Sequence, residues 1–340
     1  MQTTVRFPAE WEQQSIVQIT FPHHNSDWSD MLEEVIPCFV DIIAQASRFQ
    51  KVLVVCEDMH WVRAYLQNIS LENVTLVEIP SNDTWARDHG GITVIENGSL
   101  VILDFIFNGW GNKFIADKDN LITTELVRRG VLRPHTIRSL DYVLEGGALE
   151  TDGKGTLLTT AECLLNPNRN PQYSKEETED FLREWLGIDR VLWLHHGYLA
   201  GDDTDSHIDT LARFTDEHTI AYVHCAVTSD EHYEALKRME EELRSFRQKD
   251  GTPYKLVALP MPEACYSHNN ERLPATYANF LIINDAVLVP VYGVPQDEEA
   301  LTILQTCFPS RQIIGINCRL LIEQHGSLHC VTMQYSDHLV

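Results

Sequence analysis

The sequence contains no long uninterrupted run of apolar residues, and none approaches the ~18 residues that a membrane-spanning helix requires. Its first residues, Met1 to Thr4, show neither the charged start nor the apolar stretch of a secretory signal. No low-complexity linker interrupts the 340 residues. Length alone suggests about two domains, but single domains of this size exist. We predict one domain over residues 1–340, with no membrane partner.

Paired cysteines are also absent. Eight cysteines are scattered along the chain, and no two of them form a Cys-x-x-Cys pair. This spacing argues against a structural zinc site. In a chain without a visible secretory signal, it favours free thiols in a reducing compartment. The sequence therefore predicts a cytoplasmic protein.

Positive charge is scarce, because 26 lysines and arginines face 50 aspartates and glutamates, for a net charge of −24. Nucleic-acid binding needs the opposite field, so we predict no nucleic-acid partner. An acidic protein attracts small cations. The charge leaves two explanations open, which are solubility alone and a small cationic substrate.

What the sequence does contain is a repeated unit of strand, polar loop, strand, tight turn, strand and helix. The turns fall at Asn97, Asp152, Asp216 and Asp285, which are 55, 64 and 69 residues apart. Repeats of roughly 50 residues or more with several elements each suggest a closed radial array. Residues 16–21 form a spare first strand, which would close the fifth unit and leave no open edge.

A doubly wound parallel sheet is the alternative α/β fold. It predicts plain alternation of strands and helices, whereas here paired strands precede each helix, as the Asn97-Gly98 hairpin signal indicates. We therefore favour the radial array.

Polar residues recur at matching positions of these units. Asp88, Glu145, Asp209 and Asn279 each lie six to nine residues before the turn of their own unit. Equivalent positions of a radial array converge on one axis, so we expect these side chains to meet. Cys330, in the fifth unit, would join them there.

A lone cysteine is more often a core residue than a nucleophile. A nucleophilic cysteine needs a histidine and acidic groups that meet it in space. Residues 84–91 (TWARDHGG), 144–156 and 201–214 offer them. In an extended segment, His207 and Asp209 would share one face. The candidate catalytic residues are Cys330, His207, Asp209, Asp88 and Glu145.

Several motifs together resemble those of the agmatine deiminases and, a little more distantly, the bacterial peptidylarginine deiminases. They are PAEWE (8–12), WARDHGG (85–91), EGG (145–147), LLNPNRNP (164–171), GDDTDSHID (201–209) and a terminal HC (329–330). The motifs span nearly the whole chain in the family's order. The resemblance implies a five-bladed α/β propeller, the pentein fold, with ββαβ repeats. One departure is Gly326-Ser327-Leu328, where the family usually carries a run of glycines.

The resemblance also implies an activity, the hydrolysis of agmatine to N-carbamoylputrescine and ammonia through a thiouronium intermediate on Cys330. Asp88 and Asp209 would each grip the guanidinium group in bidentate fashion. His207 would protonate the departing ammonia and then activate water, and Glu145 would orient His207. No cofactor is implied. The family is often dimeric, so a homodimer is one assembly that the resemblance allows, although the sequence itself does not give the oligomeric state.

Four more residues complete the predicted set of substrate contacts. Trp85 and Trp110 would line the aliphatic tail of the substrate or stack on cations, although core packing explains them equally well. Asp203 and Asn279 complete the predicted substrate-binding set. Residues 10–12 match their motif, but no role follows from it.

A metal site is one alternative, because the stretch from Asp202 to Asp209 is dense in acidic residues. An EF-hand loop starting at Asp203 would need glycine and glutamate where Ile208 and Phe214 stand. The pair His195-His196 lacks the i, i+4 spacing of a helical zinc pair. We therefore predict no metal.

Two further alternatives concern the function itself. A non-catalytic binding protein on the same propeller would have lost the cysteine or a carboxylate, and all are present. A deiminase for free or peptidyl arginine is the other. A free-arginine site needs a basic residue for the α-carboxylate, with Arg128, Arg133 and Arg169 as candidates. Agmatine, which has an amine and no carboxylate, suits the acidic chain best.

Overall fold

The computed structural model describes residues 4–337, which form an α/β fold with five separate sheets. The predicted α/β class is confirmed. Residues 1–3, which belong to the stretch read as lacking a secretory signal, lie outside the described residues. Within the described part of the chain, no helix combines the length and the apolar character needed to cross a membrane.

The strands of each sheet follow one another along the chain, except at the chain ends. The first sheet contains β1 (Val5–Arg6), β5 (Ile92–Glu96), β6 (Ser99–Ile106) and β7 (Thr136–Val143). The second contains β8 (Glu150–Thr151), β9 (Thr156–Thr160) and β10 (Arg190–Leu194). The third contains β11 (Ala212–Asp216), β12 (Thr219–His224) and β13 (Lys255–Pro260). The fourth contains β14 (Leu281–Ile282), β15 (Ala286–Val291) and β16 (Gln312–Asn317). The fifth contains β2 (Gln14–Thr20), β3 (Lys51–Cys56), β4 (Val74–Glu78) and β17 (Thr332–Ser336).

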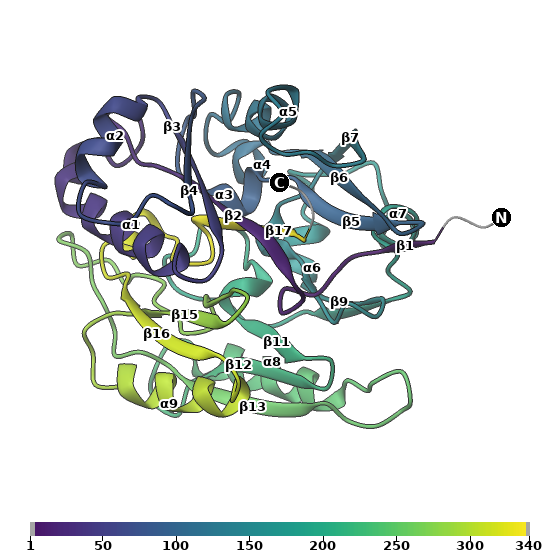
Figure 1. The fold of residues 1–340 in the computed structure, drawn as a ribbon. Helices are drawn as coiled ribbons and strands as arrows, with labels where there is room; N and C mark the ends of the chain where they lie inside the picture. Colours follow the sequence, from purple (N-terminus) through teal and green to yellow (C-terminus); the bar gives the residue numbers. More distant parts are fainter. Residues whose placement is uncertain (1–3, 338–340) are drawn as a thin grey trace.

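Helical segments connect these strands. The α-helices are α1 (Leu32–Ala46), α2 (Met59–Tyr65), α3 (Ala86–His89), α4 (Gly109–Asn112), α5 (Ile122–Arg128), α6 (Ala161–Leu164), α7 (Lys175–Leu186), α8 (Tyr233–Ser245) and α9 (Asp297–Cys307). The 3₁₀ turns are η1 (Ser29–Met31), η2 (Asp119–Leu121), η3 (Gly146–Ala148), η4 (Ile208–Thr210) and η5 (Leu321–Gln324). Helices α1 and α9 lie on the outside of the molecule (Figure 1).

The sheets share one connectivity. An antiparallel pair such as β11–β12 is followed by a helix, and the next strand, here β13, pairs parallel with the second strand of the pair. The predicted turns lie inside the antiparallel pairs. At Asn97-Gly98 both residues have positive φ, 49° and 82°, as a tight hairpin turn requires.

Our boundary between units is wrong by one strand. The strand that was expected to open each unit, for example β13, instead pairs with the preceding hairpin. The intervening helix supplies the long crossover that a parallel return needs. Sequence periodicity cannot show this, because it gives the order of elements and not their pairing.

The two ends of the chain meet in the fifth sheet. Strand β2, expected at residues 16–21, spans Gln14–Thr20 and pairs antiparallel with β17, with Ile19 opposite Thr332. These two strands lie side by side near the middle of the view in Figure 1. The last strand is therefore held in a sheet. Cys330 lies two residues before this strand and is positioned by it.

Buried apolar side chains fill the space between sheets and helices. The largest cluster joins α1 to the third, fourth and fifth sheets and includes Phe39, Phe214, Phe280 and Val287, each fully buried. The segments α3, η3 and η4 each directly precede the first strand of a hairpin (β5, β8 and β11). These short segments therefore occupy the same place in three of the repeats.

Candidate active site

A cavity of about 390 Å³ has the side chain of Cys330 on its wall. Trp85, Asp88, Trp110 and Asp203 line the same cavity. Four of the predicted substrate contacts and the predicted nucleophile therefore share one space. Loops from distant parts of the chain build it, since residues 82–88, 107–119, 203–204 and 324–330 all contribute.

Cys330 is fixed by its neighbour Asn279. The Asn279 Oδ1 atom accepts from the backbone N–H of His329 at 2.8 Å and lies 3.4 Å from the Cys330 sulfur. Its Nδ2 donates to the backbone carbonyl of Asp209 at 3.3 Å. Asn279 does not itself line the cavity. The structure thus places this predicted substrate-binding residue beneath the cysteine.

Cys330 is buried, with 3% of the residue's surface exposed. Burial raises its pKa well above the usual range, and the carboxylates of Asp209 and Asp88 raise it further. The free protein therefore holds a neutral thiol. A cation bound beside it would favour the thiolate.

Asp88 is held by two donors from different loops. Its Oδ1 accepts from the Gly147 N–H and its Oδ2 from the Trp110 indole N–H, each at 2.9 Å. Burial raises the Asp88 pKa to about 6, partly countered by His207, while Asp209 and Glu145 raise it. Gly147 must be glycine here, because a Cβ would lie 2.4 Å from His207 Nδ1 and 2.8 Å from Asp88 Oδ1.

Asp209 keeps one carboxylate oxygen free. Its Oδ2 lies 2.7 Å from His329 Nδ1, at hydrogen-bond distance, whereas the buried Oδ1 has no hydrogen-bond partner. Burial raises the pKa of Asp209, but the hydrogen bond and the charge of His329 outweigh it, so the pKa lies below its usual range. A buried, ionised oxygen without a donor is a site prepared for a cationic ligand.

His207 lies near the carboxylates of Asp88 and Glu145. Its Nδ1 is 3.6 Å from Asp88 Oδ1, and neither ring nitrogen makes a hydrogen bond. Burial lowers the pKa of His207, but Asp88, Cys163 and Glu145 together raise it well above 6.5. A raised pKa suits the ring to hold a proton and to donate it.

Glu145 has a partner that we did not predict. Both carboxylate oxygens accept from Arg169 Nε, at 2.9 and 2.8 Å, while Glu145 makes no hydrogen bond to His207. Arg169 also pairs with Asp205 at 2.7 Å, and its side chain is fully buried. Arg169 is thus committed to holding the loop around His207. Arg128 and Arg133, the other candidates for a substrate carboxylate, bond within their own segment and do not line the cavity.

Trp110 is carried by a strained segment. Trp110 has φ 55° and ψ 50°, and it lies between Gly109 and Gly111, both of which have positive φ. A bulky residue in this left-handed region costs of order 1 kcal/mol or more. The surrounding contacts stabilise it, and the result is an indole N–H aimed at Asp88.

Trp85 is packed against Gly326. A Cβ at Gly326 would lie 2.1 Å from the Trp85 ring, so this position allows no side chain while the ring stays in place. Gly326 is the first residue of the stretch that departs from the family's glycine run. The glycine retained there is the one that the cavity wall requires.

One group of described residues has metal-ligand character. Atoms of Glu145, Cys163 and His207 lie within 4.8 Å of one another, and all three residues are buried. Arg169 already neutralises Glu145 at hydrogen-bond distance. In the acidic stretch from Asp202 to Asp209, which we considered as a metal loop, Asp205 pairs with Arg169 and Lys113, and Asp209 contacts His329.

Sequence reasoning missed several residues around this site. His329 and Glu10 belong to motifs that we had noticed, HC and PAEWE, but nothing in their spacing showed that they touch. Arg213 joins the buried carboxylates of Glu10 and Glu150, at 2.7 and 2.6 Å. The available signal was an arginine among apolar residues four positions after Asp209. Such a position is buried, and a buried cation requires buried anions.

The chain belongs to the family of Porphyromonas-type peptidyl-arginine deiminases, whose model matches residues 6–336. An agmatine deiminase of Medicago truncatula is 32% identical over 96% of this chain and 95% of its own length. The resemblance read from the motifs is confirmed.

Solved structures agree with this assignment. A Porphyromonas gingivalis protein, provisionally described as an arginine deiminase, is 54% identical with a TM-score of 0.95, over 99% of this chain and 100% of that one. A cysteine-to-serine variant of Campylobacter jejuni agmatine deiminase with substrate bound is 38% identical with a TM-score of 0.93, over 100% and 98% of the two chains. The whole chain therefore has its counterpart in these structures.

Proposed function

We propose that this protein is a hydrolase that converts agmatine to N-carbamoylputrescine and ammonia, with Cys330 as its nucleophile. The observation that carries the proposal is the pair of buried carboxylates, Asp88 and Asp209, close to the cysteine of a chain in this family. Asp209 Oδ2 lies 4.0 Å from the Cys330 sulfur, and its Oδ1 is free. Two carboxylates in this position suit a guanidinium group, which is planar and cationic.

The rest of the cavity favours agmatine over arginine. Its wall carries the aspartates Asp27, Asp83, Asp88, Asp119 and Asp203, against the basic residues Lys113 and His325. Lys113 is already paired with Asp205 at 2.9 Å. Burial, together with the carboxylates of Asp27 and Asp119, raises the pKa of Asp83 to about 7. A second positive charge on the substrate would relieve this repulsion, whereas the carboxylate of arginine would add to it.

The first half of the reaction forms the covalent intermediate. The bound guanidinium group, held by Asp88 and Asp209, supplies the positive charge that favours the Cys330 thiolate, and the thiol proton passes to water. The sulfur attacks the central carbon, and His207, which carries a proton, donates it to the departing ammonia. The product of this step is a thiouronium group on Cys330.

The second half releases the product. His207, now neutral, takes a proton from water, and the resulting hydroxide attacks the thiouronium carbon. The C–S bond breaks, Cys330 regains its thiol, and the ureido product leaves. Glu145, held by Arg169, contributes negative charge that stabilises protonated His207. Asn279 positions Cys330, and Trp85 and Trp110 enclose the aliphatic tail. No cofactor or metal takes part.

A substrate panel tests the proposal. Agmatine, free arginine and a peptide with C-terminal arginine are incubated separately with the protein in the presence of EDTA, and the ureido product and ammonia are measured. We expect ureido product from agmatine alone. Turnover of arginine or of the peptide would contradict the substrate assignment and would favour the peptidyl-arginine or free-arginine alternative. Loss of turnover with EDTA would contradict a metal-independent reaction.

Replacing Trp110 by phenylalanine should raise KM for agmatine by about 10-fold, because a hydrogen bond to a charged group is worth about 1.5–3 kcal/mol. Asp88 must be ionised to bind substrate, so kcat/KM of the unmodified enzyme should fall as the pH drops through about 6, the pKa of Asp88. The Trp110 N–H lowers that pKa, so its loss should move the acidic limb to higher pH.

The matched control for this prediction is Trp193→Phe. Trp193 also donates its indole N–H to a carboxylate, Glu179, at 2.7 Å, but it does not line the cavity. Its KM and pH profile should match those of the unmodified enzyme. An unchanged KM in Trp110→Phe would contradict the role assigned to this hydrogen bond.

Four further features are proposed together with this function. The five sheets would be the blades of one closed five-bladed propeller, supported by the pairing of β2 with β17. Residues 1–340 would form a single catalytic domain. The eight cysteines are free, which agrees with a cytoplasmic location. The resemblance to the family supports a homodimer.

A further inference from the structure

A buried histidine, His329, joins a residue near the start of the chain to the active site. His329 Nδ1 is 2.7 Å from Asp209 Oδ2, and its Nε2 is 2.8 Å from Glu10 Oε2. His329 is 1% exposed, Asp209 is fully buried and Glu10 is 8% exposed. The three side chains form one continuous row, although 319 residues separate Glu10 from His329.

Each contact in this row is a hydrogen bond to a carboxylate. Burial lowers the pKa of His329, as do Arg213 and Arg87, while Glu10 and Asp209 raise it. Whichever atom holds the shared proton, both ring nitrogens lie within hydrogen-bond distance of a carboxylate oxygen. The ring therefore fixes the two carboxylates relative to each other.

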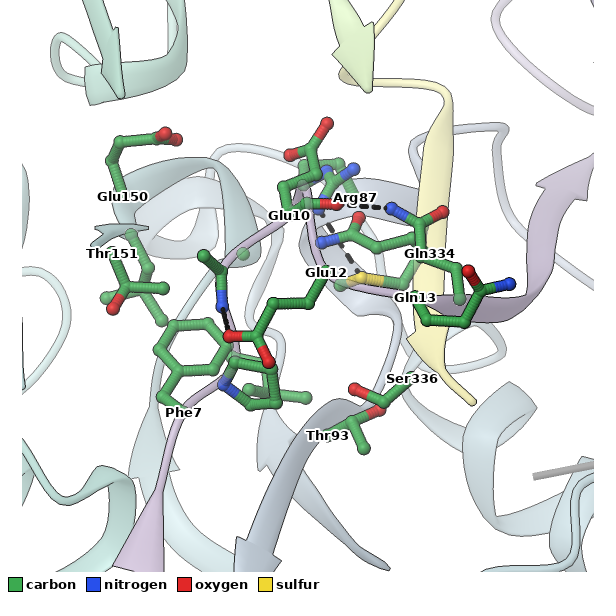
Figure 2. A pocket seen from close by; sticks show the side chains of 17 residues that line it. Phe7, Glu10, Glu12, Gln13, Arg87, Thr93, Glu150, Thr151, Gln334 and Ser336 are labelled. Atoms are coloured by element: carbon green, nitrogen blue, oxygen red, sulfur yellow. Dashed lines mark hydrogen bonds between the residues drawn. The ribbon is translucent and has the colours of Figure 1, made fainter. Parts of the chain in front are cut away.

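Glu10 is firmly anchored at the other end of the row. Its Oε1 accepts from the Ile282 N–H at 2.7 Å, and its Oε2 accepts from Arg213 at 2.7 Å and lies 2.8 Å from His329 Nε2. Burial raises the pKa of Glu10, but Arg213 and His329 lower it by more, so the pKa lies well below its usual range and Glu10 is ionised. Figure 2 shows Glu10 and Arg87 close together on the wall of a second cavity, of about 40 Å³, with Glu150 on the same wall.

We propose that Glu10 and His329 are positioning residues, which hold Asp209 so that its Oδ1 stays turned toward the substrate. The inference rests on the proposed role of Asp209 in binding the guanidinium group. Without His329, Asp209 Oδ2 would lose its 2.7 Å contact with the imidazole ring, and the carboxylate could rotate about its last side-chain bond. A displacement of about 1 Å in a positioning group is enough to cost 100-fold in rate.

The position of Glu10 explains a motif that sequence analysis left without a role. Glu10 lies in the segment between β1 and β2, and its neighbour Glu12 points elsewhere, accepting from the Ala9 N–H at 2.9 Å and pairing with Arg6. The two glutamates of PAEWE thus have different tasks. Glu12 holds its own loop, and Glu10 reaches the active site.

The test compares Glu10→Gln with the matched control Glu12→Gln. Cys330 is alkylated with 2-chloroacetamidine, a cation that resembles guanidinium, and separately with neutral iodoacetamide, and the two rates are divided. The ratio reports cation binding beside Cys330 and requires no turnover. We expect Glu10→Gln to lower it at least about 10-fold, with KM for agmatine raised by a similar factor, and Glu12→Gln to leave both unchanged.

A ratio within twofold of the unmodified protein in folded Glu10→Gln would overturn the proposal. If that variant does not fold, His329→Gln is measured in its place. A crystal structure of Cys330→Ser with agmatine or, if agmatine does not bind, guanidinium tests the same geometry with Glu10 and His329 intact. In that structure, Asp209 Oδ1 should contact the ligand and Asp209 Oδ2 should contact His329. An Asp209 carboxylate turned away from His329 would contradict the inference.

These outcomes separate the inference from the proposed function. Failure of the unmodified protein to hydrolyse agmatine would remove the proposed function while leaving the alkylation ratio as a test of the row. If the unmodified protein hydrolyses agmatine and Glu10→Gln has an unchanged alkylation ratio, the proposed function stands and the positioning role of Glu10 and His329 is contradicted.

Discussion

Replacing Cys330 by serine should lower kcat for agmatine by at least about 10⁴-fold, since removal of a nucleophile that acts together with its base costs about 10⁶-fold in a well-studied hydrolase. The serine hydroxyl is far less acidic than a thiol, and the two carboxylates near it, Asp88 and Asp209, oppose its ionisation. Binding should survive, because neither carboxylate is altered.

The measurement is single-turnover kinetics combined with calorimetric binding of agmatine. Cys265→Ser is the matched control, because Cys265 is also buried but does not line the cavity. Its kcat should change by less than about twofold. A Cys330→Ser enzyme that retains a tenth of its kcat would remove Cys330 from the chemistry.

Replacing Arg213 by methionine should lower the free energy of unfolding by about 3–5 kcal/mol, the range for breaking a buried ion pair by removal of one partner. Arg213 is fully buried and pairs with Glu10 and Glu150. It also donates to the Phe280 carbonyl at 2.7 Å and stacks over the Phe280 ring, at 4.7 Å from its centroid. Methionine fills part of the space but leaves both carboxylates without their cation.

The loss should depend on pH. Burial raises the pKa of Glu150 to about 7 even beside Arg213, and the pKa of Glu10 is held low by Arg213 and His329. Without Arg213, both folded-state pKa values rise above their unfolded values. A raised carboxyl pKa destabilises the fold above that pKa, and the penalty falls as the pH drops and the group is protonated. The difference between the variant and the unmodified protein should therefore be larger at pH 8 than at pH 5.

Urea unfolding at the two pH values measures this difference. Arg183→Met is the control, because Arg183 pairs with Asp180 on the surface, with 53% and 73% of the side chains exposed. An exposed pair is worth about 0–1 kcal/mol. A change below about 1 kcal/mol in Arg213→Met, or a larger loss at pH 5 than at pH 8, would contradict the assigned burial of charge.

The repeat was readable from the sequence because its turns have local chemistry. Asn97-Gly98 adopts positive φ at both positions wherever the tight hairpin forms, so its place in the chain is fixed by residue type. The pairing of β13 with β12 depends on how α8 packs, which no local pattern contains. Element order and the antiparallel hairpins were therefore predictable, and the parallel pairing of the third strand with the preceding hairpin was not.

The candidate site divides in the same way. Asp88, Asp209 and Cys330 stand at equivalent places in the repeat, and the structure brings them together, with Asp209 Oδ2 4.0 Å from the Cys330 sulfur. The partner of Glu145 was not predictable, because Arg169 is 24 positions away, in the loop after α6. The left-handed backbone of Trp110 is set by the loop around it and not by its own residue type.

The most direct test of the central claim is mass spectrometry of the enzyme stopped with acid during turnover of agmatine. The covalent mechanism predicts that the peptide containing Cys330 gains the mass of agmatine less one ammonia, and that the adduct disappears when substrate is exhausted. Steady turnover without an adduct on Cys330, or with one on another of the eight cysteines, would contradict it.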